Sequence, residues 1–298
     1  MFFICLLSLS TLFVSSCMMI SETKTPTDET KYFFPNVSLN FDLYDNDGIL
    51  TDSKQICNTD NFTMHIENYS NFDLDLYVFV TINCAPVAYI LNSSTYDSYN
   101  KMGMFSLNVN EIIDLTLTPN YDINDLQYSE NFLDITLIAK NRSNLPENSI
   151  TSCVYFAMNN RYSISNDMSE KPISLLKEKF SVSESHEIKY DSKNAYCLLM
   201  NEVEPDHLYQ DDKLNNKFYG VFSDTADDEF FGIYIFDGEK LASTNRNSLL
   251  INIKKNQVAV EEFNIENYSN DAIFCLKLPF FGAKHNFQFI EHSAPRYK

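Results

Sequence analysis

The feature that most constrains the fold is an alternation of apolar and polar residues across positions 62–82. Phe62, Met64 and Ile66 take every second place in the first arm, and aliphatic residues do the same in the second arm from Leu74 onward. A period of two is typical of half-buried β-strands. The segment between the arms is polar and rich in asparagine, which tolerates the backbone conformations of tight turns. The stretch therefore predicts a β-hairpin, two strands joined by a turn.

Similar short strands, separated by turn signals, are predicted throughout the first half of the chain. They cover residues 32–41, 85–91, 104–109, 112–117, 133–139 and 153–158. No stretch in this half shows the 3.6-residue periodicity of an amphipathic helix. Closely spaced strands of this kind predict a β-sandwich.

The second half of the chain echoes the first. Residues 218–236 can be laid on 62–80 at an offset of 156, and residues 250–260 on 107–117 at an offset of 143. The hexapeptide Ile-Glu-Asn-Tyr-Ser-Asn also occurs twice, but its copies are 199 residues apart and follow neither offset. We interpret the offsets as a duplicated β unit, and the hexapeptide as a turn reused elsewhere or a chance repeat.

These patterns predict an all-β protein with two tandem antiparallel β-sandwich (Ig-like) domains behind an N-terminal signal and lipidation segment. A length of 298 residues is enough for two domains with separate cores. The predicted boundaries are 1–17 for a signal peptide with lipobox, 18–30 for a flexible tether, 31–162 for the first sandwich, 163–180 for a linker with a short helix, and 181–298 for the second sandwich.

The N-terminal segment has the features of an export signal. Residues 2–14 form an apolar run that is too short to span a bilayer and matches the core of a secretory signal. The sequence Val14-Ser15-Ser16-Cys17 then has the pattern of a lipobox, in which the cysteine is lipidated and becomes the new N-terminus. No Lys or Arg precedes the apolar run. We therefore expect an extracytoplasmic protein anchored in the cell membrane by lipid on Cys17, with a cleaved and secreted form as the alternative.

The chain is strongly acidic, with a formal charge of −19. An acidic surface disfavours nucleic acid and direct adhesion to anionic lipid. It fits a self-repelling protein or one with cationic partners, and we expect membrane contact only through the anchor.

The lipobox and the Asn-Tyr-Ser-Asn turns resemble those of cell-surface lipoproteins of AT-rich Gram-positive bacteria. The segment 282–289, Gly-Ala-Lys-His-Asn-Phe-Gln-Phe, adds to this resemblance as a small loop feeding a late strand. The resemblance implies surface exposure and brings no catalytic residue with it.

No catalytic, cofactor-binding or metal-binding residues are predicted. The chain has neither a Gly-x-Ser-x-Gly elbow nor a glycine-rich phosphate loop, and its histidines lack zinc-site spacing. Asp45 and Asp47 could offer oxygens to Ca²⁺, but with Gly48 they more simply form a turn. Tyr96 and Tyr99 are candidates for stacking on a sugar, although a structural role is the favoured interpretation.

Three functions follow in order of preference. The first is a non-enzymatic surface module that binds a protein or glycan, with no cofactor. The second is a secreted glycoprotein that binds a cationic host protein, suggested by the charge and by six glycosylation sequons at Asn36, Asn61, Asn68, Asn92, Asn141 and Asn267. The third is a glycoside hydrolase with paired carboxylates, for which no two acids are singled out.

The cysteines allow one local prediction. Apart from Cys5 and Cys17 the chain has five cysteines, an odd number for an oxidising compartment. Cys197 and Cys275 fall in the second predicted domain and are the pair that could form its internal disulfide. Two buried thiols that pack as small apolar side chains are the slightly preferred alternative.

Overall fold

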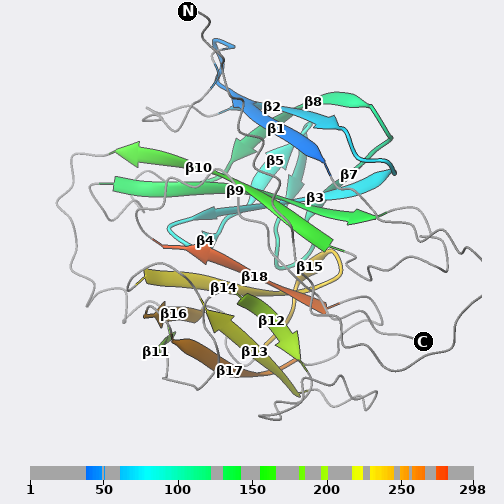
Figure 1. Cartoon of the computed structure of the whole chain (residues 1–298). Coiled ribbons are helices and arrows are strands. Elements are labelled where there is room, and N and C mark those ends of the chain that lie inside the picture. The colour runs from blue at the N-terminus through cyan, green and yellow to red at the C-terminus, as the bar shows by residue number, and fades with distance from the viewer. Residues whose placement is uncertain are drawn as a thin grey trace, which may run out of the picture.

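The computed structural model describes residues 38–48, 50, 61–121, 130–141, 155–165, 181–184, 196–200, 217–223, 229–244, 249–254, 257–265 and 273–280. This part of the chain consists of strands and the turns between them (Figure 1). Within it, no helix has the length and hydropathy needed to cross a membrane.

The first sandwich has an outer and an inner sheet. The outer sheet has the order β1 (Leu39–Tyr44), β2 (Phe62–Asn68), β8 (Ile112–Pro119), β5 (Tyr89–Leu91) and β6 (Ser94–Tyr96). The inner sheet has the order β10 (Tyr155–Ser165), β9 (Glu130–Asn141), β3 (Leu74–Ile82) and β4 (Ala85–Pro86), with β7 (Gly103–Leu107) also on β3. The two strands predicted in the 62–82 stretch are β2 and β3. The predicted hairpin is wrong, because these strands pair with partners in different sheets.

The second sandwich is built in the same way. Its inner sheet has the order β11 (Ser181–Glu184), β16 (Leu249–Ile253), β14 (Glu229–Asp237) and β15 (Lys240–Leu241), with β18 (Ile273–Pro279) on the other edge of β14. Its outer sheet has the order β12 (Tyr196–Met200), β13 (Lys217–Ser223) and β17 (Val258–Asn264). The β11–β16 pair is parallel, and the other described pairs are antiparallel.

The two sandwiches share one strand order. The outer sheets β1-β2-β8 and β12-β13-β17 correspond, and so do β9-β3-β4 and β18-β14-β15. Two sheets with this division of strands are the arrangement of an immunoglobulin-like sandwich. The predicted all-β, Ig-like sandwich fold is confirmed. The offset of 156 residues joins equivalent strands, β2 to β13 and β3 to β14, whereas the two hexapeptides follow the non-equivalent strands β2 and β17.

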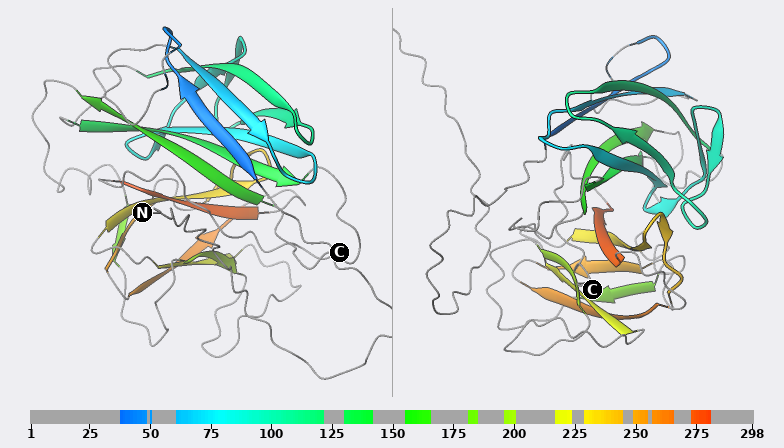
Figure 2. Two further views of the ribbon diagram at one scale, coloured as in Figure 1. Left: turned by 45° about the horizontal axis from the view of Figure 1, so that its top comes forward. Right: turned by 90° about the vertical axis from the view of Figure 1, so that its right-hand side faces the viewer.

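The four sheets lie in a stack, with the two inner sheets packed against each other (Figure 2). In β3, Leu74, Leu76 and Val78 point into the first core, while Tyr77 and Phe79 belong to a second cluster shared with β14 and β18. The prediction that β3 is half-buried is therefore wrong. The second sandwich covers the face that would otherwise meet solvent.

The domain boundaries stay predictions. Strand β10 runs to Ser165, and the rest of the predicted linker, 166–180, lies outside the described residues. The signal, Cys17 and the tether also lie outside them.

Candidate functional site

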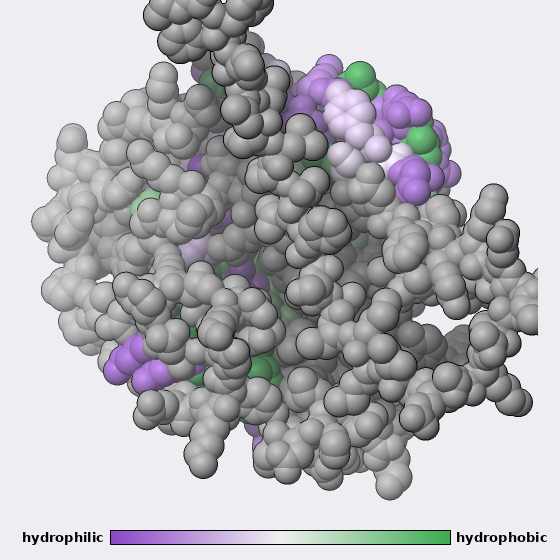
Figure 3. All heavy atoms as spheres, in the orientation of Figure 1, coloured by the Kyte–Doolittle hydropathy of each residue, from purple (hydrophilic) through white to green (hydrophobic). Residues whose placement is uncertain are grey.

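The outer face of the β1-β2-β8 sheet carries mostly polar side chains and points away from the second sandwich (Figure 1). In Figure 3 the described residues at the upper right form a mainly hydrophilic patch with hydrophobic residues among them. The opposite face of these strands fills the first core with residues such as Phe41, Met64 and Leu115. Cross-strand register arranges the outward side chains in rows of three: Asp42–His65–Asp114 and Asn40–Glu67–Ile112. Three carboxylates therefore gather around one histidine.

His65 is held between two of these carboxylates. Its Nδ1 lies 2.7 Å from Asp114 Oδ1, and its Nε2 lies 3.2 Å from Glu67 Oε1. Only the protonated ring can donate to both oxygens. The hydrogen bond with Asp114 is the main reason that the pKa of His65 is raised above 6.5, with partial burial acting in the opposite direction. His65 thus lies on the outward face, as the alternation predicts, and partly neutralises the acidic row.

Glu67 is fixed by its neighbours. The Tyr69 hydroxyl donates to Glu67 Oε2, and Asn40 Nδ2 donates to Glu67 Oε1 over 3.2 Å. These two hydrogen bonds, that from Tyr69 first, lower the pKa of Glu67. The carboxylate therefore stays charged and keeps a defined direction on the face.

In the hexapeptide turn, the side chain of Asn68 connects several strands. Asn68 is buried, and its Nδ2 donates to the carbonyls of Phe72, Leu107 and Asn108 at 3.1, 3.3 and 3.0 Å. Its Oδ1 accepts from the Ser70 amide at 2.9 Å. One side chain thereby ties together the end of β2, the start of β3 and the end of β7.

The hexapeptide turn and the neighbouring β7–β8 turn present apolar groups beside the acidic row. Tyr69 is 56% exposed, Ile112 is 58% exposed and Val109 is 39% exposed. Tyr69 directly follows β2, and Ile112 is paired with Glu67 at the start of β8. Aromatic and aliphatic groups next to ordered charges are what protein-binding surfaces combine.

The Asp45–Gly48 segment forms a turn, which is the interpretation that the sequence favoured over a calcium site. The Gly48 amide donates to the Asp45 carbonyl over 3.0 Å, and the Asp47 amide donates to Asp45 Oδ1 over 2.9 Å. Gly48 has φ of 72°, which glycine adopts without strain. Among the described residues, no group of three or more His, Cys, Asp or Glu is placed to hold a metal ion.

Two other predicted features can be placed. Tyr96 stacks on the buried Tyr89 with ring centroids 5.8 Å apart, a structural role, whereas Tyr99 is exposed in the turn after β6. Of the sequons, Asn61 and Asn92 are exposed. Asn68 is a correction, because the Nδ2 that a glycan would take is buried and already donates to three carbonyls. Asn36 and Asn267 lie outside the described residues.

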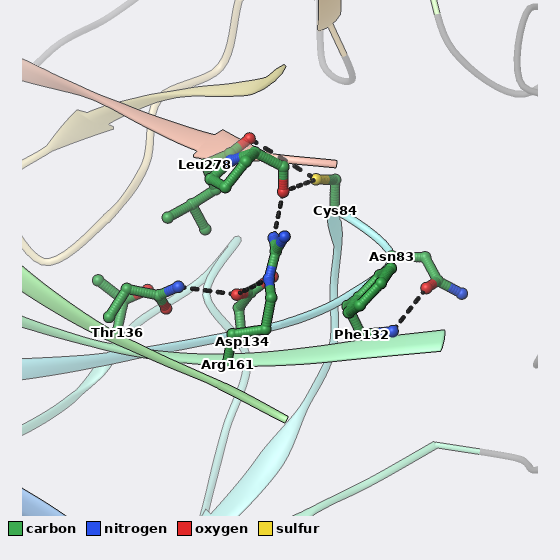
Figure 4. Close-up of polar contacts among 9 residues, drawn as sticks. Asn83, Cys84, Phe132, Asp134, Thr136, Arg161 and Leu278 are labelled. Atoms are coloured by element: carbon green, nitrogen blue, oxygen red, sulfur yellow. Dashed lines mark hydrogen bonds and ion pairs between the residues drawn. The ribbon is translucent and has the colours of Figure 1, made fainter. Parts of the chain in front are cut away.

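The opposite, covered face of the first sandwich is locked by a buried ion pair (Figure 4). Arg161 on β10 donates from Nε and Nη2 to the two oxygens of Asp134 on β9, both at 2.8 Å. Asn159 Nδ2 donates to the same carboxylate over 2.7 Å. Arg161 also donates to the backbone carbonyl of Pro279 on β18. The ion pair therefore lies within the first sandwich, and one further hydrogen bond from Arg161 reaches the second sandwich.

Cys84 is a point of close contact between the sandwiches. It sits in the β3–β4 turn with φ of 60°, a conformation rare for a residue with a Cβ. The Tyr234 hydroxyl donates to its carbonyl over 2.7 Å, and a Cβ on Gly232 would lie 2.9 Å from its Cβ and Sγ. Burial raises the pKa of Cys84 to about 12. The absence of a side chain at Gly232 is what lets β14 pack on this turn.

A second contact joins the turn after β6 to the β14–β15 hairpin. The Met102 amide donates to the Glu239 carbonyl and the Leu241 amide to the Ser98 carbonyl, at 2.7 and 2.8 Å. Lys101 Nζ lies 3.3 Å from Glu239 Oε2. Backbone hydrogen bonds of this kind fix the orientation of the two sandwiches.

Of the predicted cysteine pair, Cys197 lies on β12 and Cys275 on β18, and the structure brings them together. Their sulfur atoms are 3.3 Å apart inside the second sandwich. Cys17 lies outside the described residues.

No protein-family model and no curated protein matches this sequence. The solved structures that it is similar to include the E. coli chaperone DraB, with a TM-score of 0.31, 8% identity, and coverage of 82% of this chain and 90% of that one. The Salmonella enterica SafA pilin in complex with the SafB chaperone has a TM-score of 0.31 and 12% identity, covering 88% and 98%. The YadV chaperone has a TM-score of 0.28 and 7% identity, covering 82% and 96%. At these values the similarities assign no role to any residue here.

Proposed function

We propose that this protein is a non-enzymatic binding protein, held outside the cytoplasm by lipid on Cys17, and that the outer face of its first sandwich binds a cationic segment of a protein partner. The observation that carries the proposal is the set of three carboxylates around His65 on the sheet face that the second sandwich leaves uncovered.

Charge complementarity supports a cationic partner. Asp42, Glu67 and Asp114 lie in neighbouring rows with one partly compensating histidine, and the whole chain has a charge of −19. A field of one sign attracts oppositely charged segments and repels acidic glycans and nucleic acid. Tyr69 and Ile112 at the end of the rows would supply the apolar anchors that a purely electrostatic contact lacks.

A short Lys/Arg-rich peptide titrated into the full chain tests this function. Asp114→Asn and Glu67→Gln should each weaken binding about threefold to tenfold and reduce its salt dependence. The matched control is Glu262→Gln, which removes one charge from β17 in the outer sheet of the second sandwich. Equal weakening by all three variants would show a non-specific effect of net charge and would overturn the assignment to this face.

The anchor has a separate test. Mass spectrometry of the N-terminal peptide from the native host should find Cys17 with thioether-linked lipid and a processed N-terminus. An unmodified Cys17 in a released protein would favour the secreted form instead.

The secreted glycoprotein is the second candidate, because Asn61 and Asn92 are exposed. Expression in a glycosylating host should add glycan at these two positions and leave Asn68 unmodified. Absence of glycan in the native source would remove this candidate and leave the anchored form.

A further inference from the structure

The second sandwich contains a pair of cysteines that spans its two sheets. Cys197 lies on β12 in the outer sheet and Cys275 on β18 in the inner sheet, 78 positions apart in the sequence. Both are buried, with 5% and 1% exposure, and their sulfur atoms are 3.3 Å apart. The arrangement holds two thiols side by side in the core, between strands that are far apart in the chain.

We propose that Cys197 and Cys275 form an inter-sheet disulfide in the mature protein. The proposal is independent of the binding face, which lies on the other sandwich.

The geometry requires little movement. A disulfide has a sulfur–sulfur distance of about 2.04 Å, so the two sulfurs need to approach by about 1.3 Å from their 3.3 Å separation. Strands β12 and β18 belong to facing sheets that pack through residues such as Phe222 and Ile235. A small shift between packed sheets is sufficient, and no strand pairing has to change.

The third described thiol, Cys84, lies in an environment that does not suit a disulfide. Cys84 lies at the contact between the sandwiches, where its sulfur is 3.9 and 3.7 Å from the carbonyl oxygens of Leu278 and Pro279. It contacts backbone oxygens rather than another sulfur. Cys84 is therefore the natural internal control for the pair.

The oxidant is a disulfide, either on a thiol–disulfide oxidoreductase or on a small molecule. The thiolate of one cysteine attacks that disulfide and expels one thiolate, which leaves a mixed disulfide. The second cysteine, after losing its proton, attacks the protein sulfur of the mixed disulfide and expels the other thiolate. Two protons and two electrons leave the protein, and the oxidant is reduced to two thiols.

This chemistry belongs to the folding stage. In the folded chain the hydrogen bond with Cys197, followed by burial, raises the pKa of Cys275 well above its ordinary value. Since the thiolate is the nucleophile, the closed core would slow the reaction. The bridge then forms before the sheets close, in an oxidising compartment, so this step rests on the export of the chain proposed above.

Peptide mapping without reduction tests the bond directly on the full exported chain. A linked peptide containing Cys197 and Cys275 is expected, with Cys84 alkylated after unfolding without reductant. Alkylation of Cys197 and Cys275 under those conditions, or linkage of either one to a different cysteine, would overturn the proposal.

A stability measurement adds a second readout. Reductant should lower the melting temperature of the wild-type chain by roughly 5–10 °C, because the bridge closes a long loop. The Cys197→Ala, Cys275→Ala double variant should lose this sensitivity, and Cys84→Ala should keep it. A wild-type chain whose melting temperature is unaffected by reductant would contradict the bridge even if the double variant failed to fold.

Discussion

The two faces of the first sandwich are both built from strands whose alternate residues enter one core, yet they meet different surroundings. On β2 every second residue is buried, and His65 and Glu67 face outward. On β3 nearly every residue is buried, because Tyr77 and Phe79 pack against the second sandwich. Alternation therefore reports which residues enter the first core, and says less about what covers the opposite side.

The two faces also differ in the solvent exposure of their charged side chains. Asp114 on the open face remains largely in solvent while it pairs with His65. Asp134 on the covered face is fully buried and is matched by Arg161 and Asn159. An open charge is available to a partner, whereas a buried one must be satisfied inside the molecule. We expect substitutions on the covered face to change stability and those on the open face to change binding.

The largest effect is expected at the buried ion pair. Arg161→Met leaves the Asp134 carboxylate buried without its cation, and should lower the free energy of unfolding by about 3–5 kcal/mol. Urea unfolding monitored by circular dichroism measures this. Adding Asp134→Asn removes the stranded charge and should restore part of the loss. If the single variant unfolds at the wild-type midpoint, the buried ion pair does not stabilise the folded chain.

Phe79→Ala should have the next largest effect. Phe79 is fully buried, with ring centroids 4.9 Å from Tyr234 and 5.1 Å from Phe236 across the contact. Truncation of a buried aromatic ring costs about 3–4 kcal/mol. Ile112→Ala on the open face is the control, and should stay within about 0.5 kcal/mol of wild type. If thermal unfolding shows that both variants lose the same free energy of unfolding, the covered face contributes no more to stability than the open face.

Gly232→Ala tests the comparison at the contact between Gly232 and Cys84. The added methyl group would lie 2.7 Å from Tyr234 Oη and 2.9 Å from Cys84 Sγ, so we expect a loss of about 1–3 kcal/mol. Cys84→Gly removes one obstacle and also suits the φ of 60° in that turn. The double variant should unfold at a higher denaturant concentration than Gly232→Ala alone. An additive loss in this cycle would mean that the two positions do not meet.

The smallest effect is a pH dependence on the open face. The pKa of His65 is raised in the folded chain, mainly by Asp114, so its stabilising contribution is complete below about pH 6.5 and is lost as the pH rises through the folded value. An ion pair this exposed contributes about 0–1 kcal/mol. In an NMR titration, Asp114→Asn should move the pKa of His65 back toward its ordinary value. If the pKa of His65 is the same in the variant and the wild type, Asp114 does not affect the titration of His65.

Much of the fold could be predicted because strand periodicity is a local signal. The β2 and β3 arms, and the offset that links β2 to β13, were visible in the apolar positions alone. The contact between sandwiches was harder to foresee, since it depends on which surfaces meet. A clue was present in β3, where Tyr77–Ile82 is almost continuously apolar, as in strands that are buried on both faces.

The candidate site was predictable only in part. The alternation placed His65 outward, but its row with Asp42 and Asp114 depends on the pairing register of three strands. Arg161 and Asp134 could not be predicted as partners because neither belongs to a charge cluster or a motif in the sequence. Their partnership appears only when β9 and β10 pair. The short distance between Cys197 and Cys275 could not be predicted either, because it depends on how two sheets pack face to face.

The central claim is that the second sandwich covers one face of the first, and Cys84 reports on it directly. Its thiol is buried by Gly232 and the end of β18, and its pKa is raised to about 12. Peptide-resolved pulse alkylation of the native full chain, over increasing urea, measures how often this thiol is exposed. We predict that modification of Cys84 follows global unfolding, with the same denaturant dependence. Rapid modification without urea would show that the sandwiches separate freely, and would contradict the account.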